Sequence, residues 1–139
     1  MSLASRWVRL LMMVSAAVFA AAAFAIRAFS EGALGQYSGA ALSGSIVYAI
    51  VVFFWPPISP PVAGGIATAY CWIVEFSQLT GIPAALSQRS LVARLLLGAQ
   101  FDIVDVAWYP VGIIPLVALH WLMRARARTR APSTASTSA

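Results

Sequence analysis

The chain has 139 residues, of which 61% are hydrophobic and only 9% charged, and its net charge is +5. Soluble domains carry roughly a quarter charged residues, so a chain this apolar cannot cover a water-exposed surface. The composition therefore predicts an all-α, polytopic membrane protein with the lipid bilayer as its surroundings. A basic balance also occurs in nucleic-acid-binding proteins, but these arginines stand at the ends of apolar segments, where they orient a membrane protein; no nucleic-acid partner is expected.

Four apolar segments are each long enough to span a bilayer, which takes about 17 to 25 residues. They cover residues 8–25, 37–55, 62–79 and 103–123. The sequence "PPISPP" separates the second from the third, because proline lacks an amide donor and clashes with the preceding helical turn. The first segment has an alternative interpretation as a cleaved signal sequence, with residues 23–25 at the cleavage site, although its apolar run is longer than such segments usually have.

Two further segments are not expected to span. "LVARLLLG", residues 91–98, is too short and predicts a helix that lies in the membrane interface or forms a re-entrant turn. Residues 124–139 begin with alternating arginines and continue in serine, threonine and alanine. They predict a basic, disordered cytoplasmic tail, which leaves residues 1–123 as a single membrane domain.

With four spans, both termini lie on the same side of the membrane. Six of the nine arginines flank the termini: Arg6, Arg9, Arg124, Arg126, Arg128 and Arg130. Because cytoplasmic loops carry the excess of positive charge, both termini are predicted to be cytoplasmic. Abundant alanine and arginine without lysine indicate a GC-rich bacterial genome and hence the bacterial inner membrane. The carboxylates of Glu75, Asp102 and Asp105 then belong to the outer half.

Polar residues recur at helical spacing in the third and fourth segments, where side chains three and four apart share a face. The stripes are Gly64, Thr68, Cys71, Glu75 and Gln78, and then Asp102, Asp105, Tyr109, Gly112 and Leu116. Small residues also recur in the second segment at Gly35, Gly39 and Ser43, which favours close helix packing. A carboxylate facing lipid costs roughly 2.5 to 3.5 kcal/mol, so we expect the polar ends to face inward as a cup that opens outward.

The expected polar cluster consists of Arg27, Glu75, Gln78, Arg89, Arg94, Asp102, Asp105 and Tyr109. One interpretation is structural: salt bridges between these acids and arginines hold the helices together. A second is a binding site, in which the arginines grip a phosphate through paired hydrogen bonds while Glu75 and Gln78 bind hydroxyl or amide groups of a lipid or cell-envelope headgroup. A third is an accessory subunit whose polar stripes pair with another membrane protein.

A membrane enzyme acting on a lipid-linked substrate is a further alternative. It is not favoured, because no nucleophile–base pair and no glycine-rich phosphate loop is visible in the sequence. No metal or other cofactor is expected, because the arginines would compete for the carboxylate oxygens and the single histidine, His120, stands at the opposite end of the fourth segment.

The stretches "VEFSQL", "SQRSLVARLLLG" and "FDIVDVAWYPVG" resemble a bacterial membrane family catalogued as domain of unknown function 2809, over about residues 26–119. That family shows Glu-x-x-Gln, an arginine-containing linker, Leu-Gly-x-x-Phe and Asp-x-x-x-Tyr-x-x-Gly in this order. The matching positions are Glu75 and Gln78, Arg89 and Arg94, Leu97, Gly98 and Phe101, and Asp105, Tyr109 and Gly112. Where the family usually has Gly-Asp, this chain has Gly39 followed by Ala40.

The same order of Glu-x-x-Gln, arginine, aspartate and late glycine is more distantly similar to VanZ-like proteins. Some of those are linked to glycopeptide resistance, which implies cell-envelope surroundings. Neither resemblance implies an established reaction.

Overall fold

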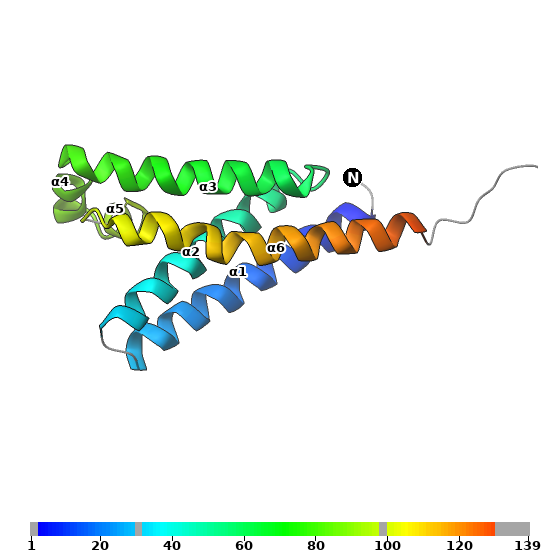
Figure 1. Ribbon diagram of the computed structural model, residues 1–139, viewed down its shortest axis with the longest axis horizontal. Coiled ribbons are helices and arrows are strands. Elements are labelled where there is room, and N and C mark those ends of the chain that lie inside the picture. The colour runs from blue at the N-terminus through cyan, green and yellow to red at the C-terminus, as the bar shows by residue number, and fades with distance from the viewer. Residues whose placement is uncertain (1–2, 30–31, 98–99, 130–139) are drawn as a thin grey trace, which may run out of the picture.

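The computed structural model describes residues 3–29, 32–97 and 100–129, and every regular element within them is helical (Figure 1). The prediction of an all-α protein is thus confirmed. The elements are α1 (Leu3–Phe29), α2 (Ala33–Phe54), α3 (Pro60–Ser77), a 3₁₀ turn (Gln78–Thr80), α4 (Ile82–Arg89), α5 (Leu91–Leu97) and α6 (Ile103–Thr129).

The four long helices coincide with the four apolar segments. Among the described residues, two stretches are long and apolar enough to cross a membrane, Tyr37–Phe54 in α2 and Ile103–Thr129 in α6. The 18-residue helix α3, which contains Pro60, Pro61 and Glu75, is not one of these two stretches. The described helices are therefore compatible with membrane insertion.

The long helices run up and down, so that chain ends and connections collect at two ends of the molecule (Figure 1). The start of α1, the α2–α3 connection and the end of α6 share one end, which we name the arginine end after Arg6, Arg9, Arg124, Arg126 and Arg128. The end of α3, the short helices α4 and α5 and the start of α6 share the other. We name this the carboxylate end after Glu75, Asp102 and Asp105.

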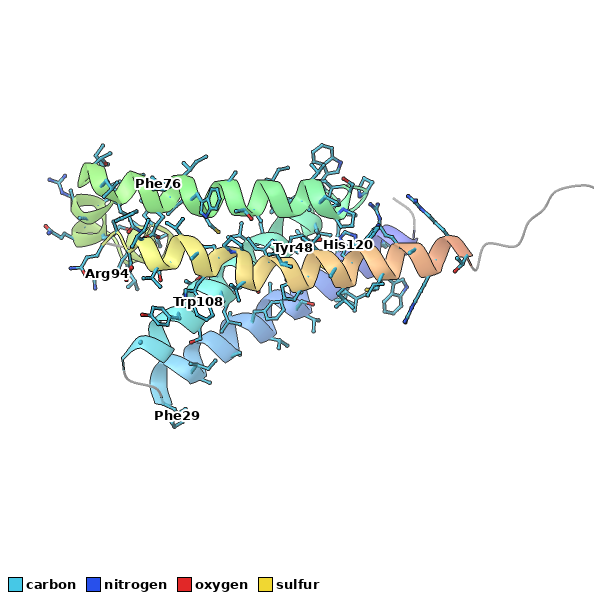
Figure 2. The ribbon with its side chains drawn as sticks, viewed as in Figure 1. Phe29, Tyr48, Phe76, Arg94, Trp108 and His120 are labelled. Atoms are coloured by element: carbon cyan, nitrogen blue, oxygen red, sulfur yellow. The ribbon has the colours of Figure 1, made fainter. Side chains whose placement is uncertain are left out.

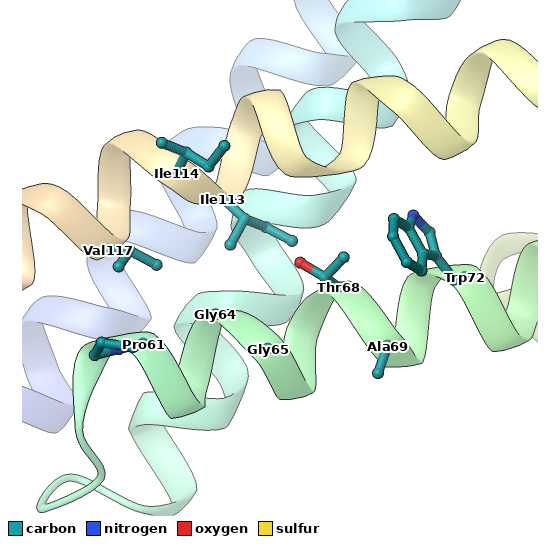
Figure 3. A pocket seen from close by; sticks show the side chains of 9 residues that line it. All are labelled: Pro61, Gly64, Gly65, Thr68, Ala69, Trp72, Ile113, Ile114 and Val117. Atoms are coloured by element: carbon teal, nitrogen blue, oxygen red, sulfur yellow. The ribbon is translucent and has the colours of Figure 1, made fainter.

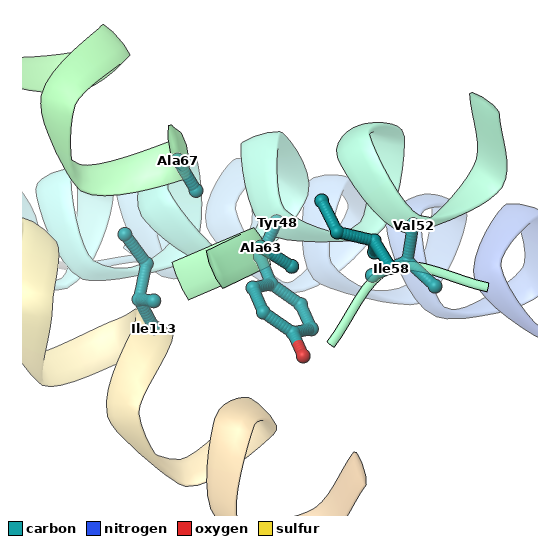
Figure 4. Packing of buried hydrophobic residues seen from close by; sticks show 6 residues of the cluster. All are labelled: Tyr48, Val52, Ile58, Ala63, Ala67 and Ile113. Atoms are coloured by element: carbon teal, nitrogen blue, oxygen red, sulfur yellow. The ribbon is translucent and has the colours of Figure 1, made fainter. Parts of the chain in front are cut away.

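The buried core lies where α2, α3 and α6 meet, and α1 packs against it through Val8 and Met12. Its residues are Tyr48, Val52, Ile58, Ala63, Ala67 and Ile113 (Figure 4). Many large apolar side chains outside this core remain exposed, including Phe54, Ile73 and Ile114. A helical bundle whose outer surface is this apolar is typical of proteins that face lipid.

Helices α2 and α6 touch backbone to backbone in the middle of the molecule. A Cβ atom added at Gly112 would overlap the Ala41 carbonyl oxygen, and one added at Gly44 would lie 2.7 Å from the Tyr109 carbonyl oxygen. The Ser45 hydroxyl donates to the Gly112 carbonyl at 2.9 Å. Small residues allow this close approach, as the sequence predicted. The face of α2 that makes the contact, however, is centred on Gly44 and Ser45, whereas Ser43 of the expected stripe is exposed.

Two boundaries differ from the sequence-based expectation. Helix α6 continues through Thr129, so residues 124–129 are helical rather than part of the tail; arginine and alanine are good helix formers, and positive side chains stabilise a helix C-terminus. Residues 130–139 lie outside the described part of the chain. The linker forms two short helices instead of one, because Gly81 in the left-handed conformation (φ 74°) ends the 3₁₀ turn and lets α4 begin at Ile82.

Candidate functional site

Glu75 lies in the last turn of α3 and is only 1% exposed. Its Oε1 accepts a hydrogen bond from the backbone N–H of Asp102 at 2.8 Å, and its Oε2 accepts one from the Tyr109 hydroxyl at 2.9 Å. A buried carboxylate is tolerated only when such donors replace water. Glu75 therefore faces inward, as expected, and connects α3 to two points of the chain at the start of α6.

Asp102 and Gln78 secure the segments on either side of this contact. The Oδ1 atom of Asp102 accepts from the backbone N–H of Val104 at 2.8 Å, which satisfies one of the free amides at the start of α6. The Nε2 atom of Gln78 donates to the Leu97 carbonyl at 2.7 Å and so holds the end of α5 against the end of α3.

Two oxygen atoms of this cluster have no hydrogen-bond partner among the described residues. Asp105 lies between Asp102 and Tyr109 at spacings of three and four residues, so it shares the α6 face that bonds to Glu75. Its Oδ1 and the Oε1 of Gln78 are buried without a hydrogen-bond partner. Buried polar atoms are nearly always paired in proteins, so these two acceptors indicate a place for a hydrogen-bond donor.

The arginines that were expected to pair with these acids are more exposed than the acids, where their side chains are described. Arg89 ends α4, Arg94 lies in α5, and both are exposed at the carboxylate end, where Figure 2 shows Arg94. The Arg27 side chain lies outside the described residues. Among the described residues, the donors to Glu75 are the Asp102 amide and the Tyr109 phenol. The structure brings together Glu75, Gln78, Asp102, Asp105 and Tyr109 from the predicted set.

Trp72 is a contributor that the sequence analysis missed. Its indole N–H donates to the Val106 carbonyl at 2.9 Å. Pro110 stands four residues after Val106 and has no N–H, so this carbonyl lacks its usual helical donor. The signal was present in the sequence as a proline inside an apolar helix, but nothing local identified Trp72 as the replacement donor.

Trp72 also lines a groove between α3 and α6. The groove measures about 410 Å³ and runs from Pro61 along Gly64 and Thr68 to Trp72 (Figure 3). Ile113 and Val117 of α6 form its other wall. Asp105 and Gln78, which carry the unpaired acceptors, are not among the residues that line this groove.

At the arginine end, two further contacts went unpredicted. The Tyr48 hydroxyl and His120 Nδ1 are hydrogen-bonded at 2.7 Å, so His120 is tied to the core rather than standing alone at the interface (Figure 2). Arg124 donates to the Ile58 carbonyl at 2.8 Å and to the Pro57 carbonyl at 2.9 Å. The proline-rich connection supplies few amide donors of its own, which leaves these carbonyls available to Arg124.

The chemistry of the carboxylate end is that of a set of acceptors. Among the described residues, no group of three or more His, Cys, Asp or Glu side chains is arranged to hold a metal ion. The two unpaired oxygens instead suit N–H or O–H donors of an organic group.

Comparison with known proteins identifies the chain at the level of a family. A family model described as "Protein of unknown function (DUF2809)" matches residues 29–113, which include α2 to α5 and the residues that meet around Glu75. No curated protein and no solved structure matches the chain. Ala40, where the resembling sequences usually have aspartate, is buried on α2 at 6% exposure, so a methyl group stands here in place of that carboxylate. The match covers well over half of the 139 residues, and the chain belongs to the DUF2809 family.

Proposed function

We propose that the protein is a four-span protein of the bacterial inner membrane, in which α1, α2, α3 and α6 cross the bilayer and both termini are cytoplasmic. Two apolar helices of sufficient length and the exposed apolar side chains around the bundle support insertion. The collection of five described arginines at one end supports the orientation, because positive charge is retained on the cytoplasmic side. The carboxylate end then faces outward.

We further propose that the carboxylate end binds the polar headgroup of a lipid or of a lipid-linked cell-envelope precursor. The observation that carries this proposal is the pair of buried, unpartnered acceptors, Asp105 Oδ1 and Gln78 Oε1. A buried acceptor without a partner costs about 1 to 3 kcal/mol, and a headgroup that supplies amine or hydroxyl donors removes this cost. Arg89 and Arg94, exposed at the same end, have the chemistry to hold its phosphate.

In this proposal the structural and the binding interpretations apply to different residues. Glu75 uses both oxygens within the protein and acts as a structural contact between α3 and α6. Asp105 and Gln78 retain acceptor atoms for a ligand. Substitutions at the two sets therefore have different expected effects on folding and on binding.

The orientation is tested with reporter fusions. A fluorescent protein that folds only in the cytoplasm, fused after residue 139, is expected to fluoresce. Alkaline phosphatase, which is active only outside, is expected to be active when fused after residue 81 and inactive after residue 139. Phosphatase activity at the C-terminus would refute the four-span topology.

Headgroup binding is tested by native mass spectrometry of the full chain purified in mild detergent. A bound lipid is expected on the wild type and at least about tenfold less on Asp105→Asn, since a hydrogen bond to a charged group contributes about 1.5 kcal/mol or more. Arg89→Gln is expected to lose it too, while Gln88→Ala, an exposed neighbour on α4, keeps it. Equal lipid occupancy in all four proteins, with unchanged melting temperatures, would reduce the cluster to a structural role.

A further inference from the structure

The two unpaired acceptors at the carboxylate end come from different side chains and differ in charge. Asp105 contributes a carboxylate oxygen, Oδ1, and Gln78 contributes an amide oxygen, Oε1; both atoms are buried without a hydrogen-bond partner among the described residues. The two side chains are half-buried, whereas Glu75 is only 1% exposed. A ligand that satisfies both atoms therefore has to bring at least two hydrogen-bond donors.

The two acceptors belong to the same helix contact. Gln78 follows Glu75 by three residues, at the end of α3, and Asp105 stands between Asp102 and Tyr109 on α6. The Asp102 amide and the Tyr109 hydroxyl donate to Glu75, so they bring the start of α6 to the last turn of α3. One polar group of a ligand is thus expected to serve both acceptors.

Two donors beside these acceptors are already used within the protein. The Asp102 amide and the Tyr109 hydroxyl carry one hydrogen each, and Glu75 accepts both. A ligand hydroxyl brings one donor and two acceptor lone pairs, for which these two groups have no hydrogen left, whereas a primary ammonium brings three donors and no acceptor. Its charge also favours the Asp105 carboxylate, since charge-assisted hydrogen bonds are about twice as strong as neutral ones.

The arginines at the same end suit the phosphate that accompanies an ammonium group in a lipid headgroup. Arg94 precedes Leu97 by three residues on α5, and the Leu97 carbonyl accepts a hydrogen bond from Gln78 Nε2 at 2.7 Å. Arg89 ends α4, and both arginines are exposed. This end therefore offers an acceptor set for a cation and guanidinium groups for an anion, which matches the two charges of a zwitterionic headgroup.

The surface around these arginines favours a lipid over a soluble amine as the source of this chemistry. Leu91 and Val92 stand between Arg89 and Arg94 in the sequence and are 67% and 63% exposed. Exposed apolar side chains beside arginines are typical of helices that lie at a membrane interface. A headgroup anchored in the membrane is thus presented directly to this end of the bundle.

We infer that the headgroup bound at the carboxylate end is zwitterionic, with a primary ammonium that donates to Asp105 and Gln78 and a phosphate that contacts Arg89 or Arg94. Phosphatidylethanolamine has this chemistry. The inference rests on the headgroup binding proposed above and names the class of headgroup that the site selects.

The test is a lipid titration of the purified full chain in mild detergent, followed by native mass spectrometry. The probes are phosphatidylethanolamine, phosphatidylglycerol and phosphatidylcholine with the same acyl chains. Phosphatidylcholine keeps the phosphate and the positive charge but has no N–H, and phosphatidylglycerol keeps the phosphate and offers hydroxyl groups. Phosphatidylethanolamine is expected to bind at least about tenfold more tightly than either, because both lack the hydrogen bond from an ammonium to a carboxylate.

Matched variants separate the ammonium contact from the phosphate contact. Asp105→Asn keeps the size of the side chain and is expected to reduce the preference for phosphatidylethanolamine over phosphatidylglycerol to less than about threefold. Arg89→Gln is expected to weaken both lipids by the same factor, because both carry the phosphate. Gln88→Ala, an exposed neighbour on α4, is expected to change neither affinity. Melting temperatures check that each variant is folded, and the comparison of the three lipids on the wild type needs no variant.

Different results would overturn different statements. If none of the three lipids binds, the proposed headgroup binding fails, and this inference fails with it. Equal affinity for the three lipids would leave headgroup binding in place and overturn the assignment of an ammonium group. An equal loss of all three lipids in Asp105→Asn would overturn it too, because Asp105 would then not distinguish between headgroups. Full competition by an equal concentration of soluble phosphoethanolamine would overturn the lipid as the source of the ammonium.

Discussion

At the carboxylate end Glu75 accepts two hydrogen bonds, whereas at the arginine end Arg124 donates two. Each charged side chain connects a helix to a neighbouring segment whose backbone lacks partners. The amides at the start of α6 have no acceptor within the helix, so a carboxylate is the side chain that pairs with the backbone there. The proline-rich connection before α3 has few amide donors for its carbonyl groups, so a guanidinium is the side chain that donates to them. The sign of each charge thus follows from the backbone groups left open at that end.

The ends also differ in what they leave unsatisfied. Among the described residues, the carboxylate end retains two buried acceptor atoms without a hydrogen-bond partner, on Asp105 and Gln78, whereas Arg6, Arg126 and Arg128 at the arginine end are exposed. The two unpaired acceptors suit N–H or O–H donors. The comparison teaches that one end of the bundle keeps acceptor atoms buried, whereas the other end presents its charge at the surface.

Separating the helices that join the two ends is expected to have the largest effect. In Gly112→Ala, the new Cβ overlaps the Ala41 carbonyl oxygen, so α2 and α6 must move apart. Overpacking of this kind costs about 3 kcal/mol. Thermal unfolding in mild detergent should show a clear loss of stability or no folded protein. Gly65→Ala is the control, since its Cβ would have no atom within 4 Å; an equal loss there would contradict the assigned contact.

Breaking the carboxylate contact comes next. Glu75→Ala leaves the Asp102 N–H and the Tyr109 hydroxyl unpaired, and we expect the free energy of unfolding to fall by about 2 to 3 kcal/mol. Asp105→Asn should change it by less than about 0.5 kcal/mol, because the affected oxygen has no partner to lose. Comparable losses in both variants would contradict the division between a structural Glu75 and a ligand-binding Asp105.

Breaking the corresponding contact at the arginine end is expected to cost less. Arg124→Gln loses two hydrogen bonds that are partly open to solvent, so we expect a loss of about 1 to 2 kcal/mol. Arg126→Gln, at an exposed position two residues away, should stay within about 0.5 kcal/mol of the wild type. The same melting experiments measure both; matching values would mean that Arg124 contributes charge and not a specific contact.

The smallest expected effect concerns the hydrogen bond between Trp72 and the Val106 carbonyl of α6. Trp72→Phe removes the donor to the Val106 carbonyl and should cost about 1 kcal/mol. Pro110→Ala restores an N–H that can bond to the same carbonyl, so the double variant should recover part of this loss. Additive losses in the double-mutant cycle would show that Trp72 and Pro110 act independently.

The sequence by itself determined the helical class, the four apolar segments, the inward orientation of Glu75 and the separation of acids from most arginines. These properties follow from hydropathy and from the helical repeat, which act within one segment. The spacing also identified Gly112 as a contact residue on α6. The same spacing placed the contact face of α2 one residue too early, at Ser43 instead of Gly44. One residue turns a helix by about 100°, and small residues occur on several faces of α2, so the spacing did not identify the correct face.

Only the tertiary structure decided which groups meet. It pairs Glu75 with an amide and Tyr109 rather than with arginines, Trp72 with the Val106 carbonyl, and Tyr48 with His120. Tyr48 and His120 are 72 residues apart, and no local spacing relates them. Such partners depend on the rotation and crossing of packed helices, which arise from many side-chain contacts acting together, so a pattern read along one segment cannot specify them.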